Sequence, residues 1–230
     1  MVLISKNETW KIFDKIATYY DLINRILSFG IDKIWRKKMA RFVKDRDLVL
    51  DIATGTADVP IAILKKRCVK GIVCIDRSMN MLIKGIKKVK HKNAFFILAD
   101  GMELPFKSCS FDAITMAFGI RNMSDPKLCL RECYRVLKRG GRIIILEFSM
   151  PKNWLVKLIY LFYLRHILPY IGRVISKDPY AYRYLNKTIE EFPYGDRFLS
   201  LLKEVGFSKT SFFSQTFGVC NIYLGEKWNF

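Results

Sequence analysis

The chain has 230 residues, enough for one α/β domain with a full hydrophobic core and near the upper limit for a single core. Its apolar fraction of 51% and aromatic fraction of 14% exclude a disordered chain. The formal net charge is +19, from 40 basic and 21 acidic residues. Such a charge indicates a protein that binds nucleic acid or an anionic membrane surface, or simply one from a basic proteome.

Strands and helices alternate from residue 48 onward, which predicts a parallel sheet wrapped by helices. Residues 1–47 precede the sheet and are expected to be helical, since Ile12, Phe13 and Ile16 have helical spacing. "LKRGGR" (137–142) has basic residues followed by glycine, which is typical of a helix end. The predicted strands are 48–52, 71–75, 94–98, 111–117 and 142–148, and the helices between them are 58–68, 78–88 and 126–138.

The character of the chain changes after residue 150. Residues 151–192 are aromatic, basic and without strand signals, so we expect a helical insertion there. A helix near 195–205 should end at Gly206, followed by the strands "KTSFFSQ" and "GVCNIYLGEK". Only two residues separate these strands, which predicts an antiparallel hairpin at the sheet edge. We therefore expect a single domain over 1–230, with 1–47 as an N-terminal helical cap.

The stretch "LVLDIATGTADVP" (48–60) predicts a ligand-binding loop at the end of the first strand. A dinucleotide fingerprint would have three glycines, but this loop has Ala53, Gly55 and Ala57. Asp51 and Asp58 flank the loop and would repel phosphates, so they favour a positively charged ligand such as S-adenosylmethionine. The alternative is a tight strand-to-helix turn without a ligand.

Further acidic residues follow the next strands. Asp76 comes 21 residues after Gly55, where a carboxylate accepts hydrogen bonds from ribose hydroxyls, and Asp100-Gly101 is placed to meet an adenine edge. A single aspartate at such a place is more often a helix cap or a turn residue. Together they open on one rim of the sheet, which predicts an S-adenosylmethionine site.

Several longer motifs resemble those of a known family, the ubiquinone/menaquinone biosynthesis C-methyltransferases. The resemblance covers nearly the whole chain and implies a Rossmann-like class I methyltransferase fold: a mostly parallel seven-stranded sheet with an antiparallel edge hairpin. It also implies S-adenosylmethionine as methyl donor and a polyprenylated quinol as acceptor. The matching motifs are "FDKIATYYDLINRILSFGIDKIWR" (13–36), "LDIATGTAD" (50–58), "LPFKSCSFDAITMAFGIRN" (104–122), "YRVLKRGGRIIILEFSMP" (134–151), "FPYGDRFLSLLKEVGF" (192–207) and "TFGVC" (216–220).

Residues are carried over from the family motif by motif. The cofactor residues that the resemblance implies are Gly55, Thr56, Asp76, Asp100, Gly101 and Ala117. The chain departs from the family pattern twice. The loop "ATGTAD" has fewer glycines than is usual, and Ala117 stands where the family often has a hydroxyl residue, so it can contribute only backbone groups.

Methylation of a ring carbon requires an electron-rich acceptor, which a hydroquinol is and an oxidised quinone is not. Deprotonating a ring hydroxyl makes the neighbouring carbon more nucleophilic, but a phenol titrates near about 10. Arg121 is the candidate that stabilises the phenolate with a fixed charge, and Asn122 orients the same oxygen. Tyr20 is the candidate for proton relay or site closure. The alternatives are a structural ion pair for Arg121 and a packing role for Tyr20.

A polyprenylated quinol lies in the bilayer, so an enzyme that acts on it must reach the membrane. The segment "NWLVKLIYLFYLRHILPYIGR" (153–173) combines aromatic and basic side chains as interfacial helices do, but "WLVKLIYLFYL" (154–164) is too short and charged to span a bilayer. The alternative is packing on the core or against a second subunit of a homo-oligomer.

The six cysteines form no CxxC pair and only two histidines are present, so we expect no zinc site. The start "MVLISKNETW" shows no secretory signal, and we expect a cytoplasmic protein peripherally associated with an anionic membrane.

Other functions remain as alternatives. A nucleic-acid methyltransferase would use the basic runs as phosphate contacts, but "FGIRN" replaces the D/N-P-P-Y-type motif expected after the fourth strand, so we expect no nucleic acid. A non-catalytic, cofactor-binding assembly partner is a second alternative, and a nicotinamide-dependent reductase is a third. For a quinone C-methyltransferase, the function that we prefer, we favour demethylmenaquinol as the acceptor over the benzoquinol of ubiquinone synthesis.

Overall fold

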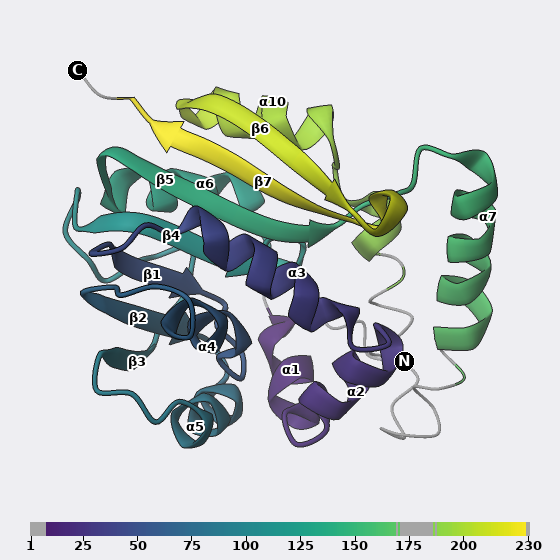
Figure 1. Cartoon of the computed structure of the whole chain (residues 1–230), viewed down its shortest axis with the longest axis horizontal. Coiled ribbons are helices and arrows are strands. Elements are labelled where there is room, and N and C mark those ends of the chain that lie inside the picture. The colour runs from purple at the N-terminus through teal and green to yellow at the C-terminus, as the bar shows by residue number, and fades with distance from the viewer. Residues whose placement is uncertain (1–7, 169, 171–185, 187, 229–230) are drawn as a thin grey trace.

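The computed structural model describes residues 8–168, 170, 186 and 188–228. Its centre is a seven-stranded sheet with the order β3-β2-β1-β4-β5-β7-β6 (Figure 1). The first five strands are parallel, whereas β7 runs antiparallel to both β5 and β6. This confirms the predicted mostly parallel sheet with its antiparallel edge hairpin. The strands are β1 Leu48–Ile52, β2 Gly71–Asp76, β3 Ala94–Leu98, β4 Phe111–Ala117, β5 Leu137–Phe148, β6 Phe207–Gln215 and β7 Cys220–Lys227.

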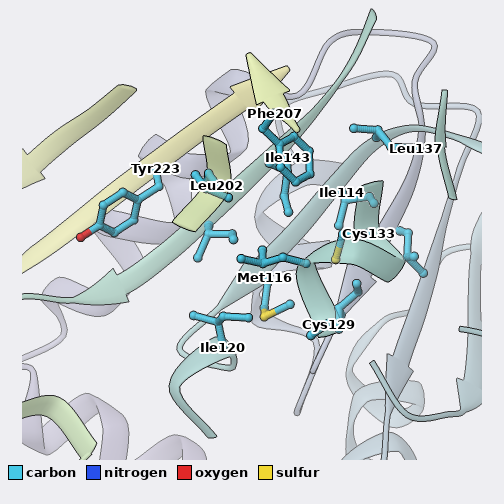
Figure 2. Close-up of a cluster of buried hydrophobic side chains, with 14 of the residues drawn as sticks. Ile114, Met116, Ile120, Cys129, Cys133, Leu137, Ile143, Leu202, Phe207 and Tyr223 are labelled. Carbon is cyan, nitrogen blue, oxygen red and sulfur yellow. The ribbon is translucent and has the colours of Figure 1, made fainter. Parts of the chain in front are cut away.

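Helices cover both faces of the sheet and create two apolar layers. On one face, α6 (Pro126–Val136) and α10 (Asp196–Val205) bury Cys129, Cys133 and Leu202 against the strands (Figure 2). On the other face, α3 (Ile31–Met39) and α4 (Asp58–Leu64) form the second layer around Met39. The strand order reverses between β1 and β4, which leaves a crevice beyond the carboxyl ends of these strands.

The N-terminal region is helical, as predicted, with α1 (Trp10–Ile16), α2 (Tyr20–Leu27) and the 3₁₀ turn η2 (Ala40–Phe42) around α3. The region is only partly a cap, because Trp35 and Met39 of α3 are buried in the sheet core. The insertion begins with helix α7 (Trp154–Phe162) and the π-helical turn η4 (Tyr163–Ile167). Helix α7 lies on the opposite side of the molecule from α5 (Met79–Lys88) (Figure 1). Most of the remainder of the insertion lies outside the described residues.

Several predicted boundaries are wrong. The predicted helix 126–138 ends at Val136, and the stretch 137–142 begins strand β5 instead of ending the helix. Gly140 has a φ of +70°, and a Cβ at Gly141 would approach the Asp112 carbonyl oxygen to 2.9 Å, so the two glycines permit an irregular pairing. The predicted helix 58–68 ends at Leu64. Residues 216–219, rather than two residues, join β6 to β7.

No helix among the described residues has both the length and the apolar character that a membrane span requires.

Candidate functional site: two adjoining cavities

A cavity of about 730 Å³ lies at the carboxyl ends of β1, β2 and β4. Every residue predicted to hold the cofactor lines it except Thr56, and Tyr20 and Asn122 from the acceptor side line it as well. The lining residues are Thr9, Trp10, Phe13, Tyr20, Ala53, Gly55, Asp76, Arg77, Met81, Ala99, Asp100, Gly101, Met102, Ala117, Phe118, Gly119, Asn122, Met123 and Ser124.

The small-residue loop after β1 forms one wall of this cavity. Ala53, Gly55 and Ala57 have φ values of +52°, +55° and +65°, so the three small positions are also the three in the left-handed region. Alanine adopts this region at a cost, whereas glycine does so freely. The Gly55 amide donates to Asp76 Oδ2 over 2.8 Å, and the Thr54 amide donates to the Ile75 carbonyl over 2.9 Å. The end of β2 therefore fixes the loop in this conformation.

Two carboxylates face the cavity from successive strand ends. Asp76 accepts from the Gly55 amide and, through Oδ1, from the Ser78 amide over 2.9 Å. Burial raises the pKa of Asp76, although these hydrogen bonds oppose the rise. Asp100 pairs with Arg77 over 3.0 Å and accepts from the Met102 amide. Each carboxylate has about four lone-pair sites, so both keep acceptor capacity for the ligand.

This donor set fits S-adenosylmethionine. The ligand presents ribose hydroxyls and an ammonium group, which donate hydrogen bonds, and Asp76 and Asp100 can accept them. The backbone also lies close to the cavity at Gly119, where a Cβ would stand 2.8 Å from the Ala53 Cβ. Side chains there would fill the space that a nucleoside needs, and glycine keeps it open.

Three residues singled out in the sequence have other partners. The Thr56 hydroxyl donates to Asp21 Oδ1 over 2.5 Å, and Lys88 Nζ lies 3.0 Å from it. Asp58 pairs with Arg25 and with Lys88. Asp51 accepts from the Thr115 hydroxyl, and burial raises its pKa to about 7. The expectation that Asp51 and Asp58 would attract a cationic ligand directly is therefore wrong, since neither lines the cavity.

The N-terminal helices, expected to form a cap, supply lining residues of the cavity, of which Tyr20 alone was singled out in the sequence. Trp10 and Phe13 of α1 line it. Asp14 accepts from the Ser78 hydroxyl over 2.6 Å and from the Asn80 amide over 3.1 Å, at the start of α5. The aromatic residues of the "NETWKIFDK" segment (7–15) were a signal for this cover, because they precede the sheet without belonging to its core.

A second, more apolar cavity of about 1030 Å³ adjoins the first and shares Phe13, Tyr20, Phe118 and Asn122 with it. It lies between the N-terminal helices on one side and α7 with η4 on the other. Its other lining residues are Ile12, Ile16, Ile23, Asn24, Ser28, Asp32, Trp35, Arg36, Arg121, Phe148, Tyr160, Tyr163, Leu164, Leu168, Ile189 and Val219.

Arg121 lines this second cavity rather than the first. It lies in the 3₁₀ turn η3 (Ile120–Asn122) and is buried against the Phe148 ring, 5.2 Å from its centroid. Its Nη1 donates to Glu147 Oε1 over 2.6 Å and to the Phe118 carbonyl over 2.8 Å. Burial raises the pKa of Glu147, while the Arg121 charge opposes the rise. The ion pair left open as an alternative is therefore present, and Arg121 still faces a cavity.

Tyr20 is a lining residue of both cavities. Burial raises the pKa of its hydroxyl, and the charges of Arg36 and Arg121 and a hydrogen bond with Asn24 oppose the rise. The structure thus brings Tyr20, Arg121 and Asn122 together around the second cavity. A site for a nucleoside adjoins a mostly apolar site whose wall includes the guanidinium groups of Arg36 and Arg121, an arrangement that suits a transfer between two bound molecules.

The chain is similar to known methyltransferases along nearly its whole length. The profile of the ubiE/COQ5 methyltransferase family matches residues 1–227. The demethylmenaquinone methyltransferase of Thermotoga maritima is 43% identical over 226 residues, covering 96% of this chain and 97% of that protein. The ubiquinone/menaquinone biosynthesis C-methyltransferase of Geotalea daltonii is 42% identical, covering 94% and 95%. Among solved structures, an SAM-dependent methyltransferase of Thermotoga maritima matches with a TM-score of 0.68 at 18% identity, covering 95% and 99%.

Proposed function

Because the chain belongs to the ubiE/COQ5 methyltransferase family, we propose that it methylates a ring carbon of a polyprenylated hydroquinol, converting demethylmenaquinol to menaquinol. The observation that carries the proposal is the pair of adjoining cavities, one with carboxylate acceptors and one mostly apolar with Arg121, beside the paired Arg36 and Asp32, in its wall. The relative named as a demethylmenaquinone methyltransferase supports the choice of ring.

Gly55, Asp76, Asp100, Gly101 and Ala117 hold S-adenosylmethionine in the first cavity. The bound cofactor supplies a methyl group on a positively charged sulfur. Asp76 and Asp100 accept hydrogen bonds, while the backbone of the small residues allows close approach. Thr56 does not line the cavity, but its hydrogen bonds with Asp21 and Lys88 support the loop from the side away from the cofactor. The two cavities share four lining residues, and such proximity of two reactants lowers the barrier by positioning.

Arg121 and Asn122 bind the ring hydroxyl next to the carbon that receives the methyl group. The Arg121 guanidinium favours the phenolate, which makes that carbon more nucleophilic. Glu147 holds Nη1 of Arg121, so the guanidinium has one orientation. Tyr20 separates the ring from the cofactor side, and its raised pKa keeps its hydroxyl protonated at neutral pH. The apolar walls exclude water from the ring.

The test is methyl transfer from a labelled donor to defined acceptors. The protein is incubated with labelled S-adenosylmethionine and with reduced demethylmenaquinone, reduced demethylated ubiquinone precursor, or a mixed RNA and DNA pool. We expect label in the naphthoquinol product. Label in the benzoquinol alone supports the second candidate, the ubiquinone step, which the name of the Geotalea daltonii relative includes beside the menaquinone step. Label in nucleic acid, or cofactor binding without any turnover, would refute the proposed function.

We further propose that the protein works in the reducing cytoplasm, bound to the surface of an anionic membrane. The outer face of α7 carries exposed Trp154, Leu158, Ile159 and Phe162, with Trp154 73% exposed. Residues 151–170 contain no carboxylate but include Lys152, Lys157 and Arg165. An apolar face with flanking cations is typical of a helix that lies in the membrane interface.

Liposome flotation tests the membrane proposal. We expect binding to vesicles with anionic lipid, weaker binding to zwitterionic vesicles, and loss of binding in Trp154→Ser/Phe162→Ser. Ile83→Ser/Ile86→Ser is the matched control, since these residues of α5 are also exposed and lie on the opposite side of the molecule (Figure 1). Equal binding by both double variants would refute the role of α7. A dimer that dissociates only in the α7 variant would favour a second subunit instead.

A further inference from the structure

Three residues in the wall of the second cavity bury a polar atom for which the described part of the chain supplies no hydrogen-bond partner. These atoms are Arg121 Nε, Asn122 Oδ1 and the Tyr160 hydroxyl. A fourth, Glu147 Oε2, belongs to the carboxylate that pairs with Arg121. A buried polar group without a partner destabilises the folded protein. Several such atoms around one cavity indicate that a bound molecule completes their hydrogen bonds.

Tyr160 is the member of this group that the proposed chemistry does not yet use. It lies in α7, on the other side of the cavity from the N-terminal helices, and is 9% exposed. Its neighbours in the local core are apolar, among them Ile12, Leu164 and Leu168. Phenylalanine would satisfy this packing equally well, so packing alone does not explain the hydroxyl.

The hydroxyl of Tyr160 is suited to be a neutral hydrogen-bonding group. Burial raises its pKa, and Tyr160 lines the same cavity as Arg121. At neutral pH the group is therefore protonated and can donate to, or accept from, a ligand oxygen. Among the described residues of the cavity wall, buried polar atoms without a partner thus lie at two places: on Arg121 with Asn122, and on Tyr160.

We propose that the Tyr160 hydroxyl binds the second oxygen of the acceptor ring, the one next to the carbon that carries the prenyl tail. This inference rests on the proposed function. A hydroquinol has two oxygens on opposite sides of its ring, and Arg121 with Asn122 binds the one next to the reacting carbon. With the other oxygen at Tyr160, the tail-bearing side of the ring faces Leu164 and Leu168, which belong to the same apolar cluster. Tyr160 is then a residue that selects diols over simple phenols and fixes which carbon is methylated.

The experiment compares two short-chain acceptors, a 2-alkyl-1,4-dihydroxynaphthalene and the matching alkyl naphthol that lacks the hydroxyl beside the alkyl group. Both are assayed with the wild-type protein and with Tyr160→Phe. We expect Tyr160→Phe to lower kcat/KM for the diol about 3- to 10-fold, as loss of one neutral hydrogen bond does, and to leave kcat/KM for the naphthol unchanged. The ratio between the two acceptors therefore falls, which a purely structural role would not produce.

Two further measurements keep the outcomes distinct. Tyr163→Phe is the matched control, because Tyr163 lines the same cavity one turn along the chain, and we expect its acceptor ratio to equal that of the wild type. The melting temperature of Tyr160→Phe should not be lower than that of the wild type, since the hydroxyl has no hydrogen-bond partner among the residues that the structure describes. An unchanged ratio in Tyr160→Phe, or a destabilised variant, would overturn this inference while leaving the proposed function in place. Failure of the wild type to methylate any diol would overturn both.

Discussion

The buried pair of Arg121 and Glu147 allows a prediction that separates catalysis from stability. In Arg121→Ala, we expect turnover to fall about 10- to 1000-fold, because a neighbouring cation lowers the pKa of an acidic hydroxyl by roughly one to three units. The affinity for S-adenosylmethionine should hardly change, since Arg121 lines the second cavity and not the first. Isothermal titration with the cofactor and a methyl-transfer assay measure the two quantities.

The same substitution should also destabilise the fold. Glu147 is fully buried, and its Oε1 accepts from Arg121 Nη1 and from the Phe148 amide. Removing one partner of a buried ion pair costs about 3–5 kcal/mol, because the remaining charge is uncompensated. Burial already raises the pKa of Glu147, so protonation of its carboxylate reduces this loss of stability. Urea unfolding at pH 8 should therefore show a larger loss than unfolding at pH 5.

The double variant Arg121→Ala/Glu147→Gln is the control for that loss. It removes both charges, so we expect most of the unfolding free energy to return while turnover stays low. Arg121→Lys should retain part of the turnover, because it keeps the charge but loses the planar fork. If turnover returns together with stability in the double variant, Arg121 has only a structural role. If cofactor affinity falls by the same factor as turnover, the assignment of Arg121 to the acceptor side is refuted.

Three further predictions concern the cofactor cavity and the core. Asp76→Asn should weaken cofactor binding about 10- to 100-fold, because the hydrogen bonds that the ligand donates to this position are then no longer made to a charged group. Titration calorimetry measures the affinity, and an unchanged value would contradict the role of Asp76 in cofactor binding. Gly119→Ala should lower the urea midpoint and the cofactor affinity together, since its Cβ would stand 2.8 Å from the Ala53 Cβ, whereas an unaffected variant would show that the loop yields easily. The Asp51 carboxyl titrates near 7 in the folded protein and near 3.8 when unfolded, so wild-type stability should decrease from pH 4 to pH 7. Asp51→Asn should therefore be the more stable protein at pH 8, by an amount on the order of a few kcal/mol that disappears near pH 4; a pH-independent difference would refute this.

Much of the cofactor half could be predicted from the sequence. The strands β1 to β4 begin and end within a residue of the predicted positions, and the resemblance to the quinone C-methyltransferases is confirmed by the family match. Asp76 and Asp100 line one cavity because parallel strands end at the same edge of a sheet, which follows from topology alone. The positive φ values of Ala53 and Ala57 could not be predicted from the sequence, because alanine adopts the left-handed region at a cost.

The acceptor half depended on tertiary packing. Arg121 meets Glu147 from a neighbouring strand end, and the second cavity exists only because α1 to α3 and α7 pack around η3. Thr56 and Asp58 turn to Asp21, Arg25 and Lys88, which come from other helices. Local periodicity and chain direction were enough to predict where the strands lie along the chain and which residues stand at their ends. The order of the strands in the sheet, the pairing of the charges and the cavity that each side chain lines depend on contacts between residues far apart in the chain, so they had to come from the structure.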